Sequence, residues 1–183
     1  NNELINIKYR DGRKNFKLVK DAEKVFYNLD STVGHDSVIV VEGELDALSF
    51  IEAGITSVVS VPNGATLNRL NLDYLDNCIE YFEDKSKIIL AVDGDEAGQN
   101  LQQELIRRFG AEVCYTVSFG SCKDANEYLL DYGGSMLNRL VSEAEPVPLE
   151  NVVTLNDIND ELQEFIEEGF KPGYQVGLDN FDS

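Results

Sequence analysis

Two acidic segments directly follow hydrophobic runs that are typical of buried strands. Residues 37–41 lead into Glu42, and residues 87–92 lead into Asp93 and Asp95. Because the carboxyl ends of parallel strands meet at one edge of a sheet, these three acids are expected to share a rim if the two strands are neighbours. Crowded carboxylates repel one another, and a hard, oxygen-liganded cation such as Mg²⁺ or Mn²⁺ suits them better than zinc.

Two further segments could contact a phosphate. Lys123 and Asp124 follow a hydrophobic run at residues 112–119, and Lys123 could neutralise a phosphate or pair with the surrounding acids. Asn63 and Gly64, in Pro62-Asn63-Gly64-Ala65, could form a backbone amide nest for an anion or an ordinary turn. The residues alone leave both alternatives open.

Helix capping is the competing interpretation for several of these acids. Carboxylates at the start of a helix accept hydrogen bonds from free N–H groups and interact favourably with the helix dipole. This interpretation is at least as good as a ligand role for Asp46, Glu96 and Glu127, and it competes for Asp95. It is weaker for Glu42, because Glu is a poor cap and this one follows four β-branched residues.

Alternating strands and helices must position these residues. Hydrophobic runs predict strands at 37–41, 57–61, 87–92 and 112–119, and helical patterns lie at 45–53, 71–82, 97–109 and 123–132. Such alternation predicts an α/β fold with a mostly parallel sheet, helices on both faces and right-handed crossovers.

The two ends of the chain differ from this pattern. Residues 5–10 and 15–19 flank an Asp-Gly turn and predict a β-hairpin, as part of a separate N-terminal lobe over 1–30. The α/β domain is predicted over 31–142. Residues 143–183 are predicted as a linker that contains an acidic amphipathic helix at 155–168.

Composition limits the class of protein. The 183 residues hold 34 Asp or Glu against 15 Lys or Arg, so the net charge is −19 and most of the surface repels nucleic acid. Residues 1–30 are the exception, with seven basic residues against five acidic ones. Three cysteines without CxxC spacing disfavour a disulfide framework or a cysteine zinc site and suit a reducing cytoplasm. No membrane span is expected, because no apolar run approaches ~20 residues.

Three motifs together resemble those of Toprim domains. Glu42-Gly43-Glu44-Leu45-Asp46 resembles the first motif, and Asp93-Gly94-Asp95 resembles the second, DxD motif. Lys123-Asp124-Ala125-Asn126 is similar to a segment of the primase half of phage primase-helicases. The resemblance implies a Toprim-type, Rossmann-like fold with an N-terminal hairpin and a C-terminal linker helix that leads to an absent helicase domain.

The resemblance also implies an activity, namely template-directed RNA primer synthesis from ribonucleoside triphosphates on single-stranded DNA. Glu42 would bind metal or act as a general base, and Asp93 and Asp95 would hold Mg²⁺ or Mn²⁺. Asp46 and Asp124 would be additional acids at the metal, and Lys123 would contact phosphate. The expected location is the cytoplasm of a bacterium or of a phage-infected host cell.

Other functions remain open on the sequence. Toprim domains also serve topoisomerases and nucleases, but the basic N-terminal segment and the Lys123 motif favour a primase. A non-catalytic metal-binding module that helps to assemble a helicase is a third alternative. A phosphatase of the haloacid dehalogenase type fits poorly, since its motif continues with Thr or Val where this chain has Ala97.

Overall fold

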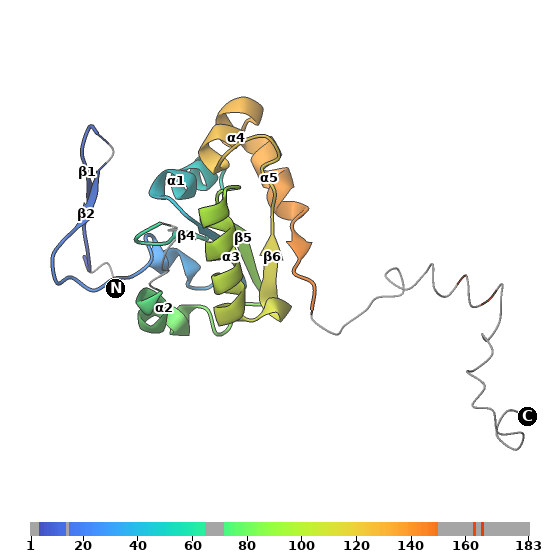
Figure 1. The fold of residues 1–183 in the computed structure, drawn as a ribbon, viewed down its shortest axis with the longest axis horizontal. Helices are drawn as coiled ribbons and strands as arrows, with labels where there is room; N and C mark the ends of the chain where they lie inside the picture. The colour runs from blue at the N-terminus through green and yellow to red at the C-terminus, as the bar shows by residue number, and fades with distance from the viewer. Residues whose placement is uncertain (1–3, 14, 65–71, 150–162, 164–165, 167–183) are drawn as a thin grey trace, which may run out of the picture. The chain divides into compact units, whose positions relative to one another are not determined.

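The computed structural model describes residues 4–13, 15–64, 72–149, 163 and 166. Its main sheet has the strand order β4-β3-β5-β6-β7, with β3 (Ser37–Val41) and β5 (Lys87–Ala91) at the centre. Strands β4 (Val58–Ser60) and β6 (Cys114–Thr116) flank them, and all four are parallel (Figure 1). The predicted α/β class is confirmed.

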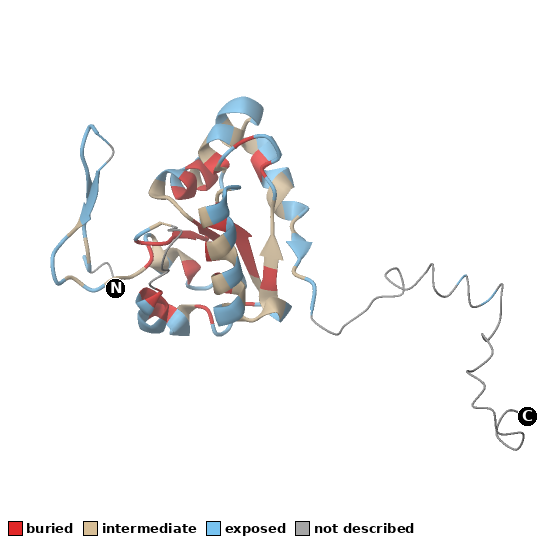
Figure 2. Cartoon of the chain, in the orientation of Figure 1, coloured by how far each residue is buried: buried red, intermediate tan, exposed pale blue. Residues whose placement is uncertain are grey.

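The central strands are buried on both faces, which explains their continuous hydrophobic sequences. Val38 and Val40 point into one hydrophobic core, whereas Ile39 and Val41 point into the other. This is the period-two alternation of side chains along a strand. The interior of the sheet therefore forms the main buried layer of the domain (Figure 2).

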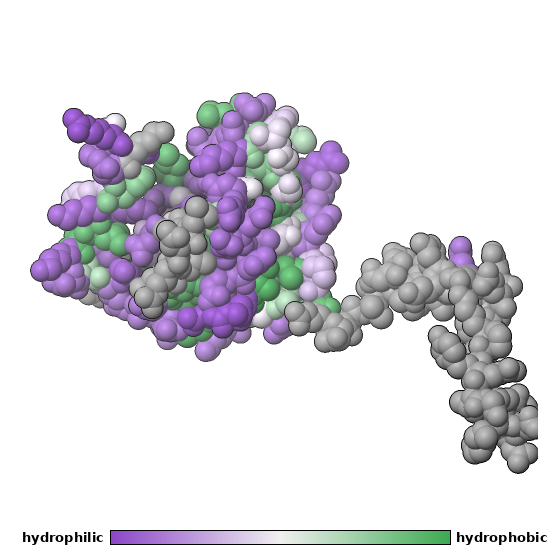
Figure 3. Space-filling model, in the orientation of Figure 1, coloured by the Kyte–Doolittle hydropathy of each residue, from purple (hydrophilic) through white to green (hydrophobic). Residues whose placement is uncertain are grey.

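Helices cover both faces of the sheet. The core on one face receives side chains from α2 (Asp73–Cys78) and α3 (Glu96–Phe109). Leu101 and Leu105 are the residues of α3 buried in it. α1 (Glu44–Glu52), α4 (Ala125–Tyr132) and α5 (Gly134–Ser142) contribute to the other core. The outer surface around α3 is hydrophilic, as expected for an amphipathic helix over a sheet (Figure 3).

The N-terminal segment contains a small antiparallel hairpin and then joins the α/β domain. β1 (Lys8–Arg10) pairs with β2 (Phe16–Leu18), which confirms the predicted hairpin. Farther along, Phe26 is buried in a core of the domain, and Tyr27 forms an antiparallel bridge with Ser60 at the edge of β4. A 3₁₀ helix, η1 (Leu29–Thr32), follows.

Two predicted elements are shorter than the sequence pattern indicates. The strand predicted at 112–119 is reduced to β6, because a 3₁₀ helix, η3 (Ala111–Val113), takes up its start. The helix predicted at 71–82 is divided into α2 and the 3₁₀ helix η2 (Ile79–Tyr81). In both cases a tighter turn satisfies backbone groups at the end of a short element.

Two other elements were not predicted. Gly133 ends α4 at Tyr132 as predicted, with a positive φ of 80°, but a second helix, α5, begins at Gly134. Residues 143–148, predicted as linker, include β7 (Glu145–Pro146), which pairs antiparallel with β6. Pro146 is tolerated there because β7 lies at the edge of the sheet.

The chain divides into a compact unit over Asn1–Val147 and a second unit over Pro148–Ser183. The acidic helix predicted at 155–168 lies outside the described residues, except that Gln163 and Ile166 are helical. Among the described residues, no helix is long and apolar enough to cross a membrane.

Candidate active site at the carboxyl edge of the sheet

Glu42 and Asp93 extend from neighbouring parallel strands. β3 and β5 pair in register, with Val41 opposite Ala91, so the residues that follow these strands emerge at the same edge. Glu42 comes directly after β3, and Asp93 comes two residues after β5. The two strands are therefore neighbours, which is the condition under which Glu42 and Asp93 were predicted to share one edge of the sheet.

Asp46 lies in the first turn of α1 and is 8% exposed. Burial, together with the charges of Asp124, Asp93 and Glu42, raises the pKa of Asp46 to about 7. The backbone N–H of Asn126 donates to Asp46 Oδ1 at 3.2 Å and opposes this rise in pKa. We call Glu42, Asp46, Asp93 and Asp124 the acidic rim.

Lys123 supplies a positive charge at the acidic rim. Its Nζ lies 2.9 Å from Asp93 Oδ2, and the Asp93 side chain is only 11% exposed whereas that of Lys123 is 62% exposed. Burial raises the pKa of Asp93 above its usual value, although the hydrogen bond and charge of Lys123 act in the opposite direction. The pKa of Lys123 is raised in turn, chiefly by the hydrogen bond to Asp93.

Two of the predicted metal ligands also cap helices. Asp95 is the N-cap of α3 and accepts a hydrogen bond from Gly98 N at 3.0 Å. Asp124 is the N-cap of α4 and accepts from Glu127 N at 2.8 Å. The capping interpretation is therefore confirmed for Asp95. A cap occupies one carboxylate oxygen, so the second oxygen of each side chain remains chemically able to bind a cation.

Gly98 is a part of the site that the sequence interpretation did not single out. A Cβ on Gly98 would lie 2.1 Å from the carbonyl oxygen of Asp93, so only glycine lets α3 approach this backbone. The sequence feature that could have identified it is a glycine in the first turn of a predicted helix, where glycine is unfavourable unless close packing requires it. Gly98 therefore fixes the position of Asp93 relative to α3.

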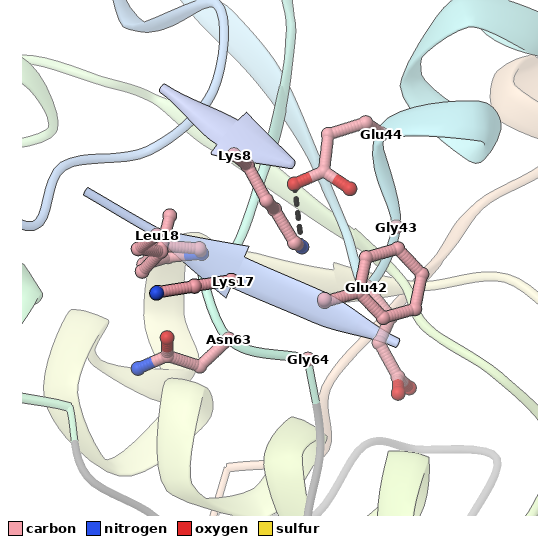
Figure 4. Close-up of a pocket in the computed structure, with 10 residues that line it drawn as sticks. Lys8, Lys17, Leu18, Glu42, Gly43, Glu44, Asn63 and Gly64 are labelled. Carbon is pink, nitrogen blue, oxygen red and sulfur yellow. Dashed lines mark hydrogen bonds and ion pairs between the residues drawn. The ribbon is translucent and has the colours of Figure 1, made fainter. Parts of the chain in front are cut away.

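Asn63 and Gly64 line a cleft of about 440 Å³ between the hairpin and the start of α1 (Figure 4). Gly64 has a φ of 67°, and a Cβ placed on it would lie 3.6 Å from Glu42 Oε1. The turn thus lies beside a rim carboxylate. Across the cleft, Lys8 Nζ of β1 contacts Glu44 Oε1 at 2.6 Å (Figure 4).

The donor atoms of the acidic rim fit a hard divalent cation. They are carboxylate oxygens, and burial, with a smaller contribution from neighbouring carboxylates, disfavours the ionised form of Asp46, which a bound cation would stabilise. Within the described ranges, no three His, Cys, Asp or Glu side chains group closely enough to form a metal cage. Mg²⁺ does not require such a cage, since it commonly binds through one or two carboxylates and keeps several waters.

A mostly parallel sheet with flanking helices and acidic strand ends is the architecture of a Toprim-type α/β domain. Residues 39–129 match the model of a family described as Toprim-like. The chain is 33% identical to the Twinkle homolog protein, chloroplastic/mitochondrial, of Arabidopsis thaliana, over 99% of this chain and 28% of the relative. It is 37% identical to the Primase homolog protein of the same plant, over 81% of this chain and 49% of the relative.

A solved structure is also similar to this chain in fold and in sequence. The primase fragment of the bacteriophage T7 primase-helicase protein superposes with a TM-score of 0.66 and 29% identity, covering 76% of this chain and 57% of that fragment. The chain therefore belongs to the Toprim-like family, and its Toprim domain is of the phage-type primase kind. It spans about half or less of the length of the two plant relatives.

Proposed function

We propose that this Toprim domain carries out Mg²⁺-dependent nucleotidyl transfer and synthesises RNA primers from ribonucleoside triphosphates on single-stranded DNA. The observation that carries the proposal is the acidic rim, where Asp46 has its pKa raised to about 7 beside three other carboxylates. A site that crowds this much negative charge is suited to a cation-assisted reaction of phosphates. The names of the similar proteins, two of which are a primase homolog and a primase fragment, support this reaction class.

Each residue of the site has a proposed role. The candidate ligands for Mg²⁺ or Mn²⁺ are Glu42, Asp46, Asp93, Asp95 and Asp124, of which one or two would bind the ion directly and the others through its waters. Glu42 would also act as the general base. A bound divalent ion would activate the attacking 3′-hydroxyl and stabilise the leaving pyrophosphate.

The contacts of the substrate are proposed separately. Lys123 would exchange its contact with Asp93 for the triphosphate, since its side chain is exposed enough to move. Backbone amides of Asn63 and Gly64 would contact the nucleotide from the other side of Glu42.

The hairpin supplies the positive charge that a template requires. Lys8 and Lys17 line the cleft beside Glu42, whereas the chain as a whole carries a net charge of −19. A basic element placed next to an acidic catalytic edge would attract the DNA backbone locally. We propose single-stranded DNA as the template on this basis and on the similarity to a primase fragment.

The experiment is a titration of Mn²⁺ and Mg²⁺ with a random single-stranded DNA library and four labelled ribonucleoside triphosphates. Labelled oligoribonucleotides that appear only with divalent ion and DNA are the expected result. Cleavage of the DNA without primer synthesis would indicate a Toprim nuclease instead. Metal binding with neither product would indicate the non-catalytic assembly module. The chain should be tested both alone and with a helicase domain fused at its C-terminal end.

The wider setting is also part of the proposal. A replicative helicase domain is the proposed partner in a longer protein, as in the primase-helicase to which this chain is similar. Cys78, Cys114 and Cys122 are free and buried, which suits a reducing compartment such as the cytoplasm of a bacterium or a phage-infected cell.

A further inference from the structure

We propose that Asn126 and Ser49 are positioning residues that hold Lys123 against Asp93. The proposal rests on the proposed function in one respect, since it takes Lys123 and Asp93 to be members of the active site. It assigns a role to two side chains that do not themselves lie on the acidic rim.

The position of Lys123 needs an explanation because its strand does not provide one. Glu42 and Asp93 lie within two residues of β3 and β5, so those strands place them directly. Lys123 is separated from the end of β6 at Thr116 by a segment without helix or strand. A lysine on such a segment would otherwise sample many positions relative to the carboxylates.

Asn126 joins the first turn of α4 to two points on α1. Its backbone N–H donates to Asp46 Oδ1 at 3.2 Å, and its side-chain Nδ2 donates to Ser49 Oγ at 3.1 Å. Asp46 and Ser49 are one helical turn apart and are 8% and 3% exposed. The two bonds therefore fix both the position and the rotation of the start of α4.

Ser49 is arranged to accept this bond. Its hydroxyl donates to the carbonyl oxygen of Leu45 at 2.9 Å, so its lone pairs are directed to the Asn126 amide. An alanine at either position removes this bond but leaves the backbone bond to Asp46 possible. The side-chain bond can therefore be tested separately from the acidic rim.

Three contacts carry this restraint to Lys123, which precedes Asn126 by three residues. Asp124 caps α4 through Glu127 N, and the carbonyl oxygen of Lys123 accepts from Gly94 N at 3.3 Å. Lys123 Nζ then contacts Asp93 at 2.9 Å. Since Gly94 follows Asp93 directly, the backbone and the side chain of Lys123 are both held at the same loop.

The first test is a double-mutant cycle read by Mn²⁺ affinity. Lys123→Met removes a cation from Asp93 and should tighten Mn²⁺ binding by roughly threefold, as expected for a partly exposed ion pair. In an Asn126→Ala or Ser49→Ala background, Lys123→Met should tighten Mn²⁺ binding by less than half of that factor, because Lys123 is no longer held in place. A gain that is unchanged in both backgrounds would overturn the proposal.

The second test requires no metal. Exchange of the Gly94 amide proton, measured by NMR on the metal-free chain, should become several-fold faster in Asn126→Ala and Ser49→Ala. The matched control is Asn138→Ala, because Asn138 Nδ2 binds Ala53 O at 2.6 Å and thereby ties α5 to the far end of α1. This control should lower thermal stability similarly and leave Gly94 exchange and the Lys123→Met effect unchanged.

The outcomes separate this inference from the proposed function. If the wild-type chain binds no Mn²⁺, the proposed function fails, and Gly94 exchange alone decides the positioning role. If Asn138→Ala accelerates Gly94 exchange as much as Asn126→Ala does, the effect is general destabilisation and the positioning role is rejected.

Discussion

Burial of one carboxylate controls the charge of the acidic rim. Asp46 is buried in the first turn of α1 beside other acids, and its pKa of about 7 means that it takes up or releases a proton near neutral pH. In the unfolded chain the pKa of Asp returns to about 3.9. The folded state therefore binds more protons than the unfolded state between these values, and stability is lost as the pH rises through this range.

Asp46→Asn should remove this dependence of stability on pH. The amide Oδ1 can still accept from Asn126 N, so the substitution removes charge with little change of shape. The free energy of unfolding of the variant should match wild type near pH 4 and exceed it by about 4 kcal/mol near pH 8, at ~1.4 kcal/mol for each unit of pKa shift. Chemical denaturation at several pH values measures the difference.

Magnesium provides the control for this experiment. With Mg²⁺ at millimolar concentration, the advantage of Asp46→Asn at pH 8 should shrink, because a bound cation stabilises the ionised carboxylate in wild type. A difference between the two proteins that Mg²⁺ leaves untouched would show that the ion binds away from Asp46.

Glu42→Gln should abolish primer synthesis without unfolding the chain. If Glu42 serves as general base and metal ligand, the rate should fall at least about 10²-fold, whereas the thermal midpoint should stay the same or rise as like charge is removed. Glu96→Gln is the matched control, since Glu96 is an exposed acid in the first turn of α3. Equal losses of primer yield in both variants would contradict the role of Glu42.

At the scale of elements, the sequence predicts the buried central strands, and with them the residues that follow each strand. The hydrophobic runs at 37–41 and 87–92 correctly place Glu42 and Asp93, because continuous burial leaves a strong local signal. The shortened β6 and the added β7 were missed, since their length depends on pairing with a distant segment. Helix α5 was missed because the two glycines predict the end of a helix. Gly133 does end α4, with a positive φ, but α5 begins at the next residue.

The contacts within the site were less predictable than its members. The ion pair of Lys123 with Asp93 and the bonds from Asn126 to α1 join segments that are far apart in the chain. Such contacts depend on side-chain packing and leave no periodic pattern in the sequence. Gly98 left a local signal, but its reason became clear only from the nearby backbone of Asp93.

Gly98→Ala should disrupt the junction of β5 and α3. The added methyl group would overlap the Asp93 carbonyl, at 2.1 Å, so either α3 or the Asp93 backbone must move. We expect a loss of about 2 kcal/mol or more in unfolding free energy, and weakened Mn²⁺ binding, since overpacking against backbone relaxes poorly.

Gly94→Ala is the control for this substitution. No atom lies within 4 Å of a Cβ placed on Gly94, and it has no positive φ. Its unfolding free energy should therefore stay within about 0.5 kcal/mol of wild type. Similar losses for the two alanine variants would indicate that the loop, rather than the approach of α3, is sensitive.

At the scale of the whole described unit, charge is unevenly distributed: the carboxyl edge of the sheet is acidic, whereas the hairpin is basic. The acidic rim lies at the carboxyl end of the central strands, and Lys8 and Arg10 lie over the ring of Phe16 on one face of the hairpin. Lys8 also contacts Glu44 at the start of α1. The hairpin contributes no residue to the two hydrophobic cores among the described residues, so polar contacts such as this one must hold it.

Lys8→Ala should therefore release the hairpin without unfolding the domain. Cleavage at Phe16 by chymotrypsin should accelerate by a few-fold, the range expected for a partly exposed ion pair, while the thermal midpoint of the domain stays constant. Wild type in 1 M salt should behave like the variant, because the Debye length falls to about 3 Å. Lys20→Ala is the control, since Lys20 is 88% exposed and lies 3.9 Å from its neighbour Asp21. A fall in the midpoint that parallels the faster cleavage would mean that the hairpin and the sheet unfold as one unit.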